Sequence, residues 1–399
     1  MLMLYYNIGV GIGKSLAAHG LATVKIEPAI HCKGRMTGVG LPEDWKSGYL
    51  PTVRYLHDVW RFIMKKQLST LLVLCLLLLS ACSPQNAKNE GNNGHQKEAA
   101  QTQEAGYPVT VTTVDSDGNP VEQTFDKAPE RVVAVYQSAI ENMLALGLGD
   151  KLVLAGQLDI DVKDEWKDEF SKVKYMKDAP SKEAVLAADP DFIISWSSYF
   201  KDKTLGSVKE WQDKGIHTFI LKNSGAVKVD SLDNEYDDLL TLGKIFNKEK
   251  EAQAIVDSMK SRLEEAHARQ EKKIKDGEKP LKVAILEMED EGVFRNYGKD
   301  TVGGQIAEQA GAELAMDGDR FGAEQLVAKD PDVIFVVYYG EDKVRDEELA
   351  KFKKLPALKA LSAITKDHVY PISLSEVYAS GVRTADGIDT MIKGIESSR

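Results

Sequence analysis

The feature that most constrains the fold of this chain is a nine-residue pattern that occurs twice along it. Residues 183–191 read EAVLAADPD and residues 324–332 read EQLVAKDPD, and both run directly into apolar residues. Each copy predicts a short helix, a turn bounded by proline and a buried strand. An earlier apolar strand precedes each copy, at residues 132–135 and 283–286. The repeat therefore predicts two like α/β lobes.

A long helix is expected between the two copies. Residues 248–275 contain neither glycine nor proline and consist mostly of strong helix formers. Apolar residues recur there at a spacing of three or four, which gives one narrow stripe, at Ile255, Met259, Leu263 and Ala266. At about 1.5 Å per residue this helix spans about 40 Å, roughly a domain diameter. The predicted fold class is therefore α/β, with two Rossmann-like lobes joined by one long rigid helix and a ligand cleft between the lobes.

Charge and cysteine content exclude several classes of function. The formal net charge is −11, and residues 1–81 hold nine basic and four acidic residues, so the remainder carries −16. Such an acidic body argues against binding to nucleic acid and against an electrostatic grip on anionic lipid. The three cysteines, Cys32, Cys75 and Cys82, all lie in the first fifth of the chain. The rest of the chain is therefore expected to contain no disulfide, no thiolate metal site and no cysteine nucleophile.

Patterns typical of catalysis or of a bare metal site are also missing from the sequence. There is no G-x-S-x-G elbow and no H-E-x-x-H motif. Residues 9–15 are rich in glycine, but the spacing of a phosphate loop requires glycine at position 8, which is Ile8. His217 falls within an apolar strand and His368 within a turn, which favours packing roles over metal binding. We therefore expect no enzyme activity, no cofactor and no metal held by the protein itself.

An export signal is predicted at residues 64–81. Met64 is followed by two lysines and then by an apolar run from Leu68 to Leu79, the order typical of a secretory signal. Leu79-Ser80-Ala81-Cys82 resembles the lipobox of bacterial lipoproteins, which implies cleavage before Cys82 and acylation of that cysteine. The alternative, an uncleaved membrane anchor, needs about 20 apolar residues, and this run is shorter. We expect a protein that is lipid-anchored to the bilayer at the outer face of the cytoplasmic membrane.

The segments on either side of the signal are expected to stay outside the globular part. Residues 1–63 have little pattern and are interpreted as an upstream extension that a wrong start codon has added. Residues 82–106 comprise the acylated cysteine and a polar stretch without aromatic residues. Such a stretch cannot bury enough surface to fold, so it is expected to serve as a flexible tether.

Several runs of the remaining chain carry a family resemblance. Residues 129–135 read PERVVAV and residues 138–156 read SAIENMLALGLGDKLVLAG. Together with the two Asp-Pro-Asp strands and the long helix, they resemble the periplasmic binding proteins of iron–siderophore, haem and cobalamin ABC importers. The resemblance implies a monomeric carrier that delivers its ligand to an ABC permease dimer with a separate ATPase. It divides the chain into an N-terminal lobe at 107–230, a helical connector at 231–278 and a C-terminal lobe at 279–399.

Two glutamates are predicted to dock on the permease. In the family, a glutamate at the place of Glu141 on each lobe meets arginines of the permease, and the counterpart in the second lobe is Glu308. Glu141 also has a local explanation, because Ser138-x-x-Glu141 is the pattern of a helix capping box. Glu183 and Glu324 begin the two copies of the repeat, where a carboxylate is favourable to the helix dipole, and they are interpreted as structural.

The ligand is expected at the carboxyl ends of the strands, where the lobes of such proteins face each other. Aromatic, serine and arginine residues gather in the loops after these strands, at Tyr136, Trp196, Ser197, Tyr199, Arg295, Tyr297, Tyr338, Tyr339, Tyr378 and Arg383. Together they predict a wide cleft lined with rings, which suits a large, partly apolar chelate or macrocycle. Arg295 and Arg383 suit the anionic oxygens of a ferric chelate or a propionate. Rim packing is the alternative for any one of these residues.

A ferric siderophore is the predicted ligand, with its iron held by the chelate, and haem or cobalamin is the alternative. Haem iron takes an axial ligand from its protein, and Tyr136 is a candidate for that role. A protein of a different class, a ligand-sensing lipoprotein without a role in transport, fits the same sequence.

Overall fold

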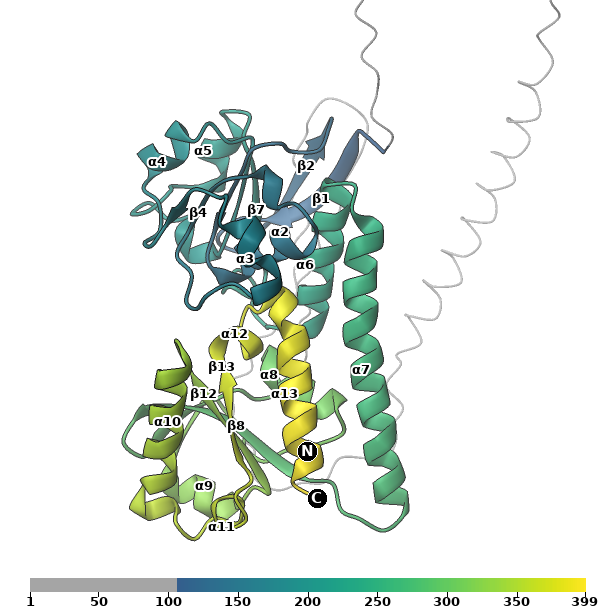
Figure 1. The fold of residues 1–399 in the computed structure, drawn as a ribbon, viewed down its shortest axis with the longest axis vertical. Coiled ribbons are helices and arrows are strands. Elements are labelled where there is room, and N and C mark those ends of the chain that lie inside the picture. Colours follow the sequence, from purple (N-terminus) through teal and green to yellow (C-terminus); the bar gives the residue numbers. More distant parts are fainter. Residues whose placement is uncertain (1–105) are drawn as a thin grey trace, which may run out of the picture. The chain divides into compact units, whose positions relative to one another are not determined.

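The computed structural model describes residues 106–399, and within them the two copies of the repeat fold alike in two different sheets (Figure 1). The first copy forms helix α4 (Lys182–Ala187) and strand β6 (Phe192–Ser195), and the second forms helix α9 (Ala323–Lys329) and strand β12 (Val333–Tyr338). An N-terminal lobe surrounds β6 and a C-terminal lobe surrounds β12. The predicted α/β fold class with two lobes is therefore confirmed.

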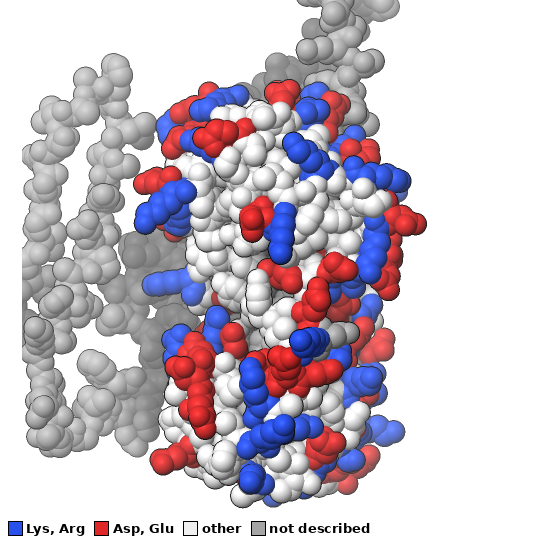
Figure 2. Space-filling view, turned by 60° about the vertical axis from the view of Figure 1, so that its left-hand side comes forward, with Lys and Arg blue, Asp and Glu red and all other residues white. Residues whose placement is uncertain are grey.

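The predicted signal peptide, the acylation of Cys82, most of the tether and the extension of residues 1–63 lie outside the described residues. In the part of the chain that the structure describes, none of the helices combines the length and the apolar character that crossing a membrane requires. Figure 2 shows lysine and arginine side chains interspersed with aspartate and glutamate over one face of this part.

The N-terminal lobe is built on five parallel strands in the order β5-β4-β3-β6-β7. Both faces of this sheet are covered by helices. Val132 and Ala134 of the central strand share a core with α2 and α6, whereas Val133 and Val135 share one with α4 and α5. The other elements of this lobe and its connection are β3 (Val132–Val135), β4 (Leu152–Gly156), β5 (Tyr175–Met176), β7 (His217–Ile220), α2 (Gln137–Ala145), α3 (Lys167–Phe170), α5 (Val208–Gln212) and α6 (Leu232–Ile245).

A β-hairpin precedes the first sheet along the chain. Its strands, β1 (Val109–Val114) and β2 (Pro120–Phe125), pair antiparallel. Gln123 Nε2 donates a hydrogen bond of 2.7 Å to the carbonyl of Thr218 on β7. This buried bond attaches the hairpin to the N-terminal lobe.

The C-terminal lobe has a mixed sheet in the order β11-β9-β8-β12-β13, with β10 also paired to β8. Strands β8, β10, β12 and β13 are parallel, whereas β9 runs antiparallel to β8 and β11 antiparallel to β9. One face packs on α7, α8 and α13 and the other on α9 and α10. The remaining elements are β8 (Lys282–Asp290), β9 (Val293–Asn296), β10 (Glu313–Leu314), β11 (Arg320–Gly322), β13 (Val369–Ser373), α8 (Val302–Gln309), α10 (Asp342–Lys354), α11 (Ser362–Thr365), α12 (Leu374–Val377) and α13 (Thr384–Ser397).

The last aspartate of each repeat ties its strand to the strand alongside. Asp191 accepts the N–H of Arg131 at 2.8 Å, one residue before β3 begins. Asp332 accepts the N–H of Lys282 at 2.9 Å, at the first residue of β8. Because β6 lies beside β3 and β12 beside β8, these bonds set the same relation between strands in both lobes. The second aspartate of the Asp-Pro-Asp pattern therefore has the same structural role in each copy.

Helix α7 (Glu249–Lys275) runs alongside both lobes (Figure 1). Its start contributes to the core of the N-terminal lobe, whereas Met259, Leu263 and Ala266 belong to the core of the C-terminal lobe. These three residues of the predicted stripe are buried, and Ile255 is partly exposed. The predicted long helix between the lobes is confirmed.

Candidate functional site

Three aromatic side chains from the two lobes meet at the carboxyl ends of the strands. Tyr136 follows β3 and Trp196 follows β6, and their rings stack with centroids 4.7 Å apart and planes 18° apart. Tyr378, which follows β13 and α12, meets the ring of Trp196 edge-on with centroids 5.8 Å apart. The indole N–H of Trp196 donates to Ser138 Oγ at 2.9 Å and so fixes the ring. We call Tyr136, Trp196 and Tyr378 the aromatic cluster.

Of the seven non-glycine residues with positive φ among the described residues, the three that are neither aspartate nor asparagine are Tyr136, Gln157 and Ala379. Tyr136 has a φ of 77° and a ψ of 155°, a region that residues other than glycine rarely occupy. Gln157, which follows β4, and Ala379, next to Tyr378, also have positive φ values, of 60° and 44°. Such conformations cost about 1–3 kcal/mol each and cluster where function holds them in place. The strain therefore marks this junction as the candidate site.

Ser138 does not cap helix α2, so the predicted capping box is wrong. The helix follows Tyr136, and no side-chain hydrogen bond caps its start. The hydroxyl of Ser138 is engaged by the indole of Trp196 instead. The carboxylate of Glu141 bonds to Arg383 of the C-terminal lobe rather than to the start of its own helix.

Glu141 and Arg383 form a bidentate ion pair between the lobes. Arg383 Nε lies 2.5 Å from Glu141 Oε2, and Arg383 Nη2 lies 2.6 Å from Glu141 Oε1. The glutamate is 0% and the arginine 8% exposed. Burial raises the pKa of Glu141, and the hydrogen bonds from Arg383 oppose that rise. Charged hydrogen bonds of this geometry are strong, and one member left buried without the other is costly.

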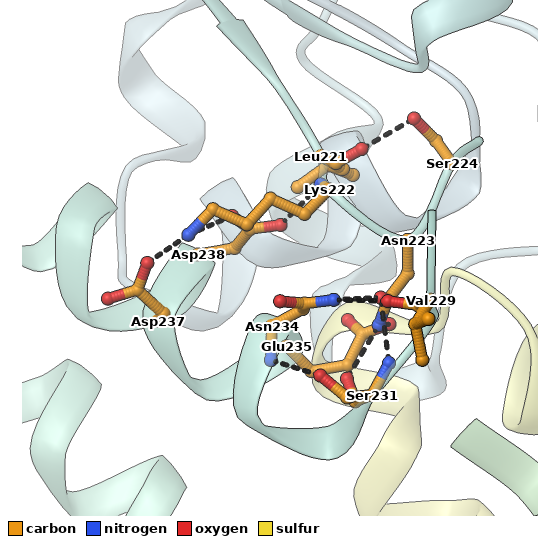
Figure 3. Close-up of polar contacts among 10 residues, drawn as sticks. All are labelled: Leu221, Lys222, Asn223, Ser224, Val229, Ser231, Asn234, Glu235, Asp237 and Asp238. Carbon is orange, nitrogen blue, oxygen red and sulfur yellow. Dashed lines mark hydrogen bonds and ion pairs between the residues drawn. The ribbon is translucent and has the colours of Figure 1, made fainter. Parts of the chain in front are cut away.

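Glu235, in the first turn of α6, binds the chain just before Arg383. Its carboxylate accepts the N–H groups of Ser380 at 3.1 Å and of Gly381 at 2.7 Å. The side chain is 3% exposed, and burial raises its pKa. Asn223 Nδ2 donates to the same carboxylate at 2.8 Å (Figure 3). Glu235 therefore connects the loop after β7 to the C-terminal lobe.

The loop between β7 and α6 is itself fixed by polar contacts (Figure 3). Asn223 Oδ1 accepts a hydrogen bond of 2.9 Å from the amide of Asn234. The N–H of Lys222 donates to Asp238 Oδ2 at 2.8 Å, and burial raises the pKa of Asp238 well above its usual value. These contacts attach the start of α6 to the N-terminal lobe and so hold Glu235 in position.

Gly381 allows the chain to approach helix α2 closely. The N–H of Val382 donates to Asn142 Oδ1 at 2.9 Å. Gly381 has a φ of 54°, and a Cβ at this position would lie 2.3 Å from the same oxygen, so a larger residue does not fit. Residues 380–383, which we call the latch segment, are therefore bound by α2 and α6 together.

The pocket beside the aromatic cluster is nearly closed in this conformation. Its cavity volume is about 10 Å³, far below the roughly 300–1,000 Å³ typical of ligand sites. It is lined by Trp196 and Tyr378 together with Gln137, Ser138, Asp159, Leu374, Ser375, Ala379 and Ser380. Three of the rings that were expected to line a wide cleft contact one another in this conformation, and the wide cleft stays a prediction.

The comparison with known proteins agrees with this architecture. Residues 132–373 match the periplasmic binding protein family. The chain belongs to this family. The predicted family resemblance is therefore confirmed.

Relatives of this periplasmic binding protein align over most of their length. The uncharacterized ABC transporter substrate-binding lipoprotein YvrC of Bacillus subtilis (strain 168) is 25% identical over 331 residues, which cover 81% of this chain and 95% of YvrC. The iron-uptake system-binding protein of the same organism is 25% identical over 334 residues, 80% of this chain and 94% of that protein. A crystal structure of a periplasmic binding protein from Veillonella parvula DSM 2008 has 30% identity and a TM-score of 0.67, covering 72% of this chain and 92% of that chain.

Six of the predicted ligand residues lie at least partly exposed at the ends of strands. Tyr339 is 54% exposed, and the other five are intermediate, namely Tyr136, Trp196, Arg295, Tyr338 and Tyr378. The structure brings Tyr136, Trp196 and Tyr378 into direct contact. Contact of these six residues with a ligand remains a prediction.

Four of the predicted ligand residues are buried and already engaged by the protein. Arg383 is held in the ion pair described above. Ser197 Oγ donates to the carbonyl of Ser224 at 2.6 Å, and the hydroxyl of Tyr199 donates to a carbonyl of the N-terminal lobe. The hydroxyl of Tyr297 donates to a carboxylate oxygen of the C-terminal lobe at 2.8 Å. Their burial gives these residues structural roles in this conformation.

Arg295 is the predicted cation that stays close to the aromatic cluster. Its guanidinium lies over the ring of Tyr297 at 4.9 Å and over the ring of Tyr378 at 5.5 Å. Arg295 Nη1 also lies 3.7 Å from Glu287 Oε2. Contacts with two ring faces and a carboxylate hold this side chain in a defined position.

Asp159 is a pocket residue that the sequence analysis missed. Its carboxylate accepts a hydrogen bond of 2.8 Å from the hydroxyl of Tyr339 in the other lobe. Burial raises the pKa of Asp159, and the bond from Tyr339 opposes that rise. The two residues lie 180 positions apart in sequence, so no local pattern marks them. The same holds for Glu235, which binds residues of the latch segment that lie more than a hundred positions away.

The two histidines considered in the sequence have packing roles. The ring of His217 stacks on Phe125 with centroids 4.1 Å apart, and burial lowers the pKa of His217. His368 Nδ1 lies 3.3 Å from the carbonyl of Asp332. Among the described residues, no group of three or more histidines, cysteines and carboxylates is placed to hold a metal ion.

Breaking the ion pair between the lobes is expected to destabilise this periplasmic binding protein strongly. Glu141→Gln leaves Arg383 buried without a counter-charge, and we expect a loss of about 3–5 kcal/mol in the free energy of unfolding. The double variant, Glu141→Gln with Arg383→Met, no longer contains the unpaired cation and should recover part of that loss. Urea unfolding of the two single variants and the double variant measures this coupling.

A surface pair supplies the matched control for this cycle. Arg262 lies 2.8 Å from Asp389 at an exposed position, so Asp389→Asn should cost less than about 1 kcal/mol. Strictly additive losses in the Glu141 and Arg383 cycle would show that the two side chains do not depend on each other.

Glu376, on α12 beside the latch segment, is expected to make stability depend on pH. Burial raises its pKa from 4.5 to about 7, and a hydrogen bond of 3.0 Å from Thr390 opposes that rise. Between pH 4.5 and 7 the folded state therefore binds more protons at Glu376 than the unfolded state does. The stability that comes from this proton is fully present below pH 4.5 and is lost as the pH rises through 7.

Glu376→Gln removes this titration. It should flatten the fall in unfolding free energy between about pH 4.5 and 7 by up to about 1.4 kcal/mol per pH unit. Urea unfolding at a series of pH values measures the slope. A variant with the same slope as the original protein would contradict the raised pKa.

Proposed function

We propose that this protein is the solute-binding component of an ABC importer and that it captures a ferric siderophore, with haem or cobalamin as the alternative ligand. Membership of the periplasmic binding protein family supports this proposal, as do relatives named for ABC substrate binding and for iron uptake. The observation that carries it is the aromatic cluster. Rings from both lobes at the ends of the strands suit a large, partly apolar chelate or macrocycle.

The lobes have to separate to admit such a ligand, because the pocket beside the aromatic cluster has a cavity volume of only about 10 Å³. Helix α7 packs on the cores of both lobes and limits how far they can move apart. We therefore propose a small hinge motion rather than a wide closure. The protein itself hydrolyses nothing in this scheme, and ATP is used by a separate subunit of the importer.

Lipid anchoring completes the proposal. The relative YvrC is described as a lipoprotein, and Leu79-Ser80-Ala81-Cys82 of this chain has the spacing of a lipobox after an export signal. Acylation of Cys82 would hold the carrier at the outer face of the cytoplasmic membrane, next to its permease. The polar residues that follow Cys82 give the binding lobes reach from the bilayer.

The structure changes which carboxylates we propose for docking on the permease. Glu141 is buried and paired with Arg383, so it does not reach a partner protein in this conformation, whereas Glu308 on α8 is exposed. Glu183 and Glu324 are also exposed, in the first turns of α4 and α9. Because the repeat places these two at equivalent positions of the lobes, they suit a permease dimer that presents the same surface twice. We therefore add Glu183 and Glu324 to Glu308 as docking residues.

Isothermal titration of the purified protein with ferric siderophores, haemin and cobalamin tests the ligand proposal. We expect one of these classes to bind, and Trp196→Ala to weaken that binding at least about tenfold because a stacked ring contributes about 2 kcal/mol. Leu186→Ala, at an exposed apolar side chain of α4, is the matched control and should leave the Kd unchanged. Failure of every class to bind would overturn the proposal, and an unaltered Kd for Trp196→Ala would move the site elsewhere.

Charge reversal tests the docking proposal. Glu183→Lys together with Glu324→Lys should abolish uptake of labelled ligand by cells that contain the permease, because reversed charges repel the basic groups of the partner. The Kd of the purified variant should remain that of the original protein. Asp213→Lys, at an exposed site just after α5, is the control for reversal itself. If Glu308→Lys alone abolishes uptake and the double variant does not, docking depends on Glu308.

A further inference from the structure

Three arginines near the candidate site are each paired with a carboxylate of the protein. The buried pair between the lobes already uses Arg383. Arg295 on β9 lies directly opposite Glu287 of β8, with Nη1 3.7 Å from the carboxylate. Arg320 on β11 donates two hydrogen bonds to Glu289, of 2.6 and 2.8 Å. Arg295 and Arg383, which were expected to meet an anionic ligand, are therefore matched within the protein, and so is Arg320 nearby.

Arg295 is restricted further by its neighbours. The faces of its guanidinium are taken up by the rings of Tyr297 and Tyr378, at 4.9 and 5.5 Å. Asp230 is close enough to Arg295 that the arginine lowers its pKa, although burial raises the pKa of Asp230 to about 6. One carboxylate and two rings thus contact Arg295, and the negative charge of a second carboxylate, Asp230, is close enough to interact with it. Little of its charge is left to attract an anion.

Asp159 differs from these arginines, because its charge is not matched by an ion pair among the described residues. It lines the space between the lobes, and its carboxylate accepts a hydrogen bond from the neutral hydroxyl of Tyr339. In the part of the chain that the structure describes, no lysine, arginine or histidine forms an ion pair with it. Its negative charge is therefore directed toward any ligand held between the lobes.

The net charge of the chain has the same sign, although Figure 2 shows acidic and basic side chains interspersed on the face turned away from α7. The formal charge of residues 82–399 is −16. A field of this sign lowers the local concentration of anions and raises that of cations near the cleft.

We propose that this cleft selects ligands without net negative charge and that Asp159 is a specificity-determining residue for that selection. The proposal rests on the proposed function of the cleft. The ligands that fit are neutral or cationic ferric hydroxamates and neutral corrinoids. Ferric catecholates and haem, which carry several ionised oxygens, meet a carboxylate that forms no ion pair with a basic side chain of the described residues.

Pairs of ligands that differ in charge alone test the proposal. Three ferrioxamines share one hydroxamate scaffold and end in a free amine, an acetylated amine or a succinylated amine, so they are cationic, neutral and anionic. Cyanocobalamin and one of its monocarboxylic acids form a second set, and haemin and its dimethyl ester form a third. Isothermal titration of the full-length protein in detergent gives a Kd for each member. Within the scaffold that binds, we expect the acidic form to bind about tenfold more weakly than the neutral form.

Asp159→Asn keeps an acceptor for Tyr339 and removes the charge. We expect this variant to lower the ratio of the two Kd values, acidic form over neutral form, by about five- to tenfold. Asp213→Asn is the matched control, because it removes a carboxylate from an exposed pair with Lys209 on α5. Its ratio should equal that of the original protein. This comparison separates the charge at the pocket from the net charge of the protein.

The outcomes distinguish this inference from the proposed function. Tighter or equal binding of the acidic form within a scaffold that binds would overturn the charge selection and leave the carrier role intact. An unchanged ratio in Asp159→Asn would remove Asp159 as its source. If no scaffold binds at all, the proposed function fails and the charge selection fails with it.

Discussion

The ion pair between Glu141 and Arg383 is the interaction on which the arrangement of the two lobes depends. Both ends are buried, and each would stay desolvated and unpaired if the other were displaced. A buried pair of this kind adds little net stability compared with apolar residues of the same shape, because both charges had to leave water. Its effect is on specificity, since any other packing of the lobes leaves two charges without partners.

The remaining contacts between the lobes are of unequal strength, and this inequality determines how the protein can open. Glu235 holds the latch segment through two backbone N–H groups at a buried position. Tyr339, which bonds to Asp159, is instead half exposed, and exposed contacts contribute about 1 kcal/mol or less. Separation is therefore cheapest on the side of Tyr339 and most costly at the latch segment. A hinge at the latch segment keeps the two lobes aligned with each other while the pocket enlarges on the side of Tyr339.

The fold was predictable from the sequence because its determinants are local. The repeat and the long helix are patterns within about 30 residues, and the strands that follow Asp191 and Asp332 are buried on both faces and therefore read as continuous apolar runs. The contacts of the site are not local. Glu141 and Arg383 lie 242 residues apart, and the Ser138-x-x-Glu141 pattern matched a capping box that does not form. Tertiary contacts with Trp196 and Arg383 were more favourable than the local alternative, and no window of sequence contains them.

The pairing of charges at the candidate site was likewise not predictable from the sequence. A residue that follows a parallel strand is placed at the edge where ligands bind, so sequence alone located the rings and the arginines. It did not show which charges the protein uses itself. Arg295 and Arg383 both lie where an anion was expected, yet each is matched by a glutamate of the protein, whereas Asp159 at the pocket forms no ion pair in the described part of the chain. Because pairing of this kind involves only side chains at the ends of strands, it can change between members of a family while both cores stay the same. The sign of the ligand charge that such a carrier accepts therefore depends on its ion pairs and is not determined by the fold.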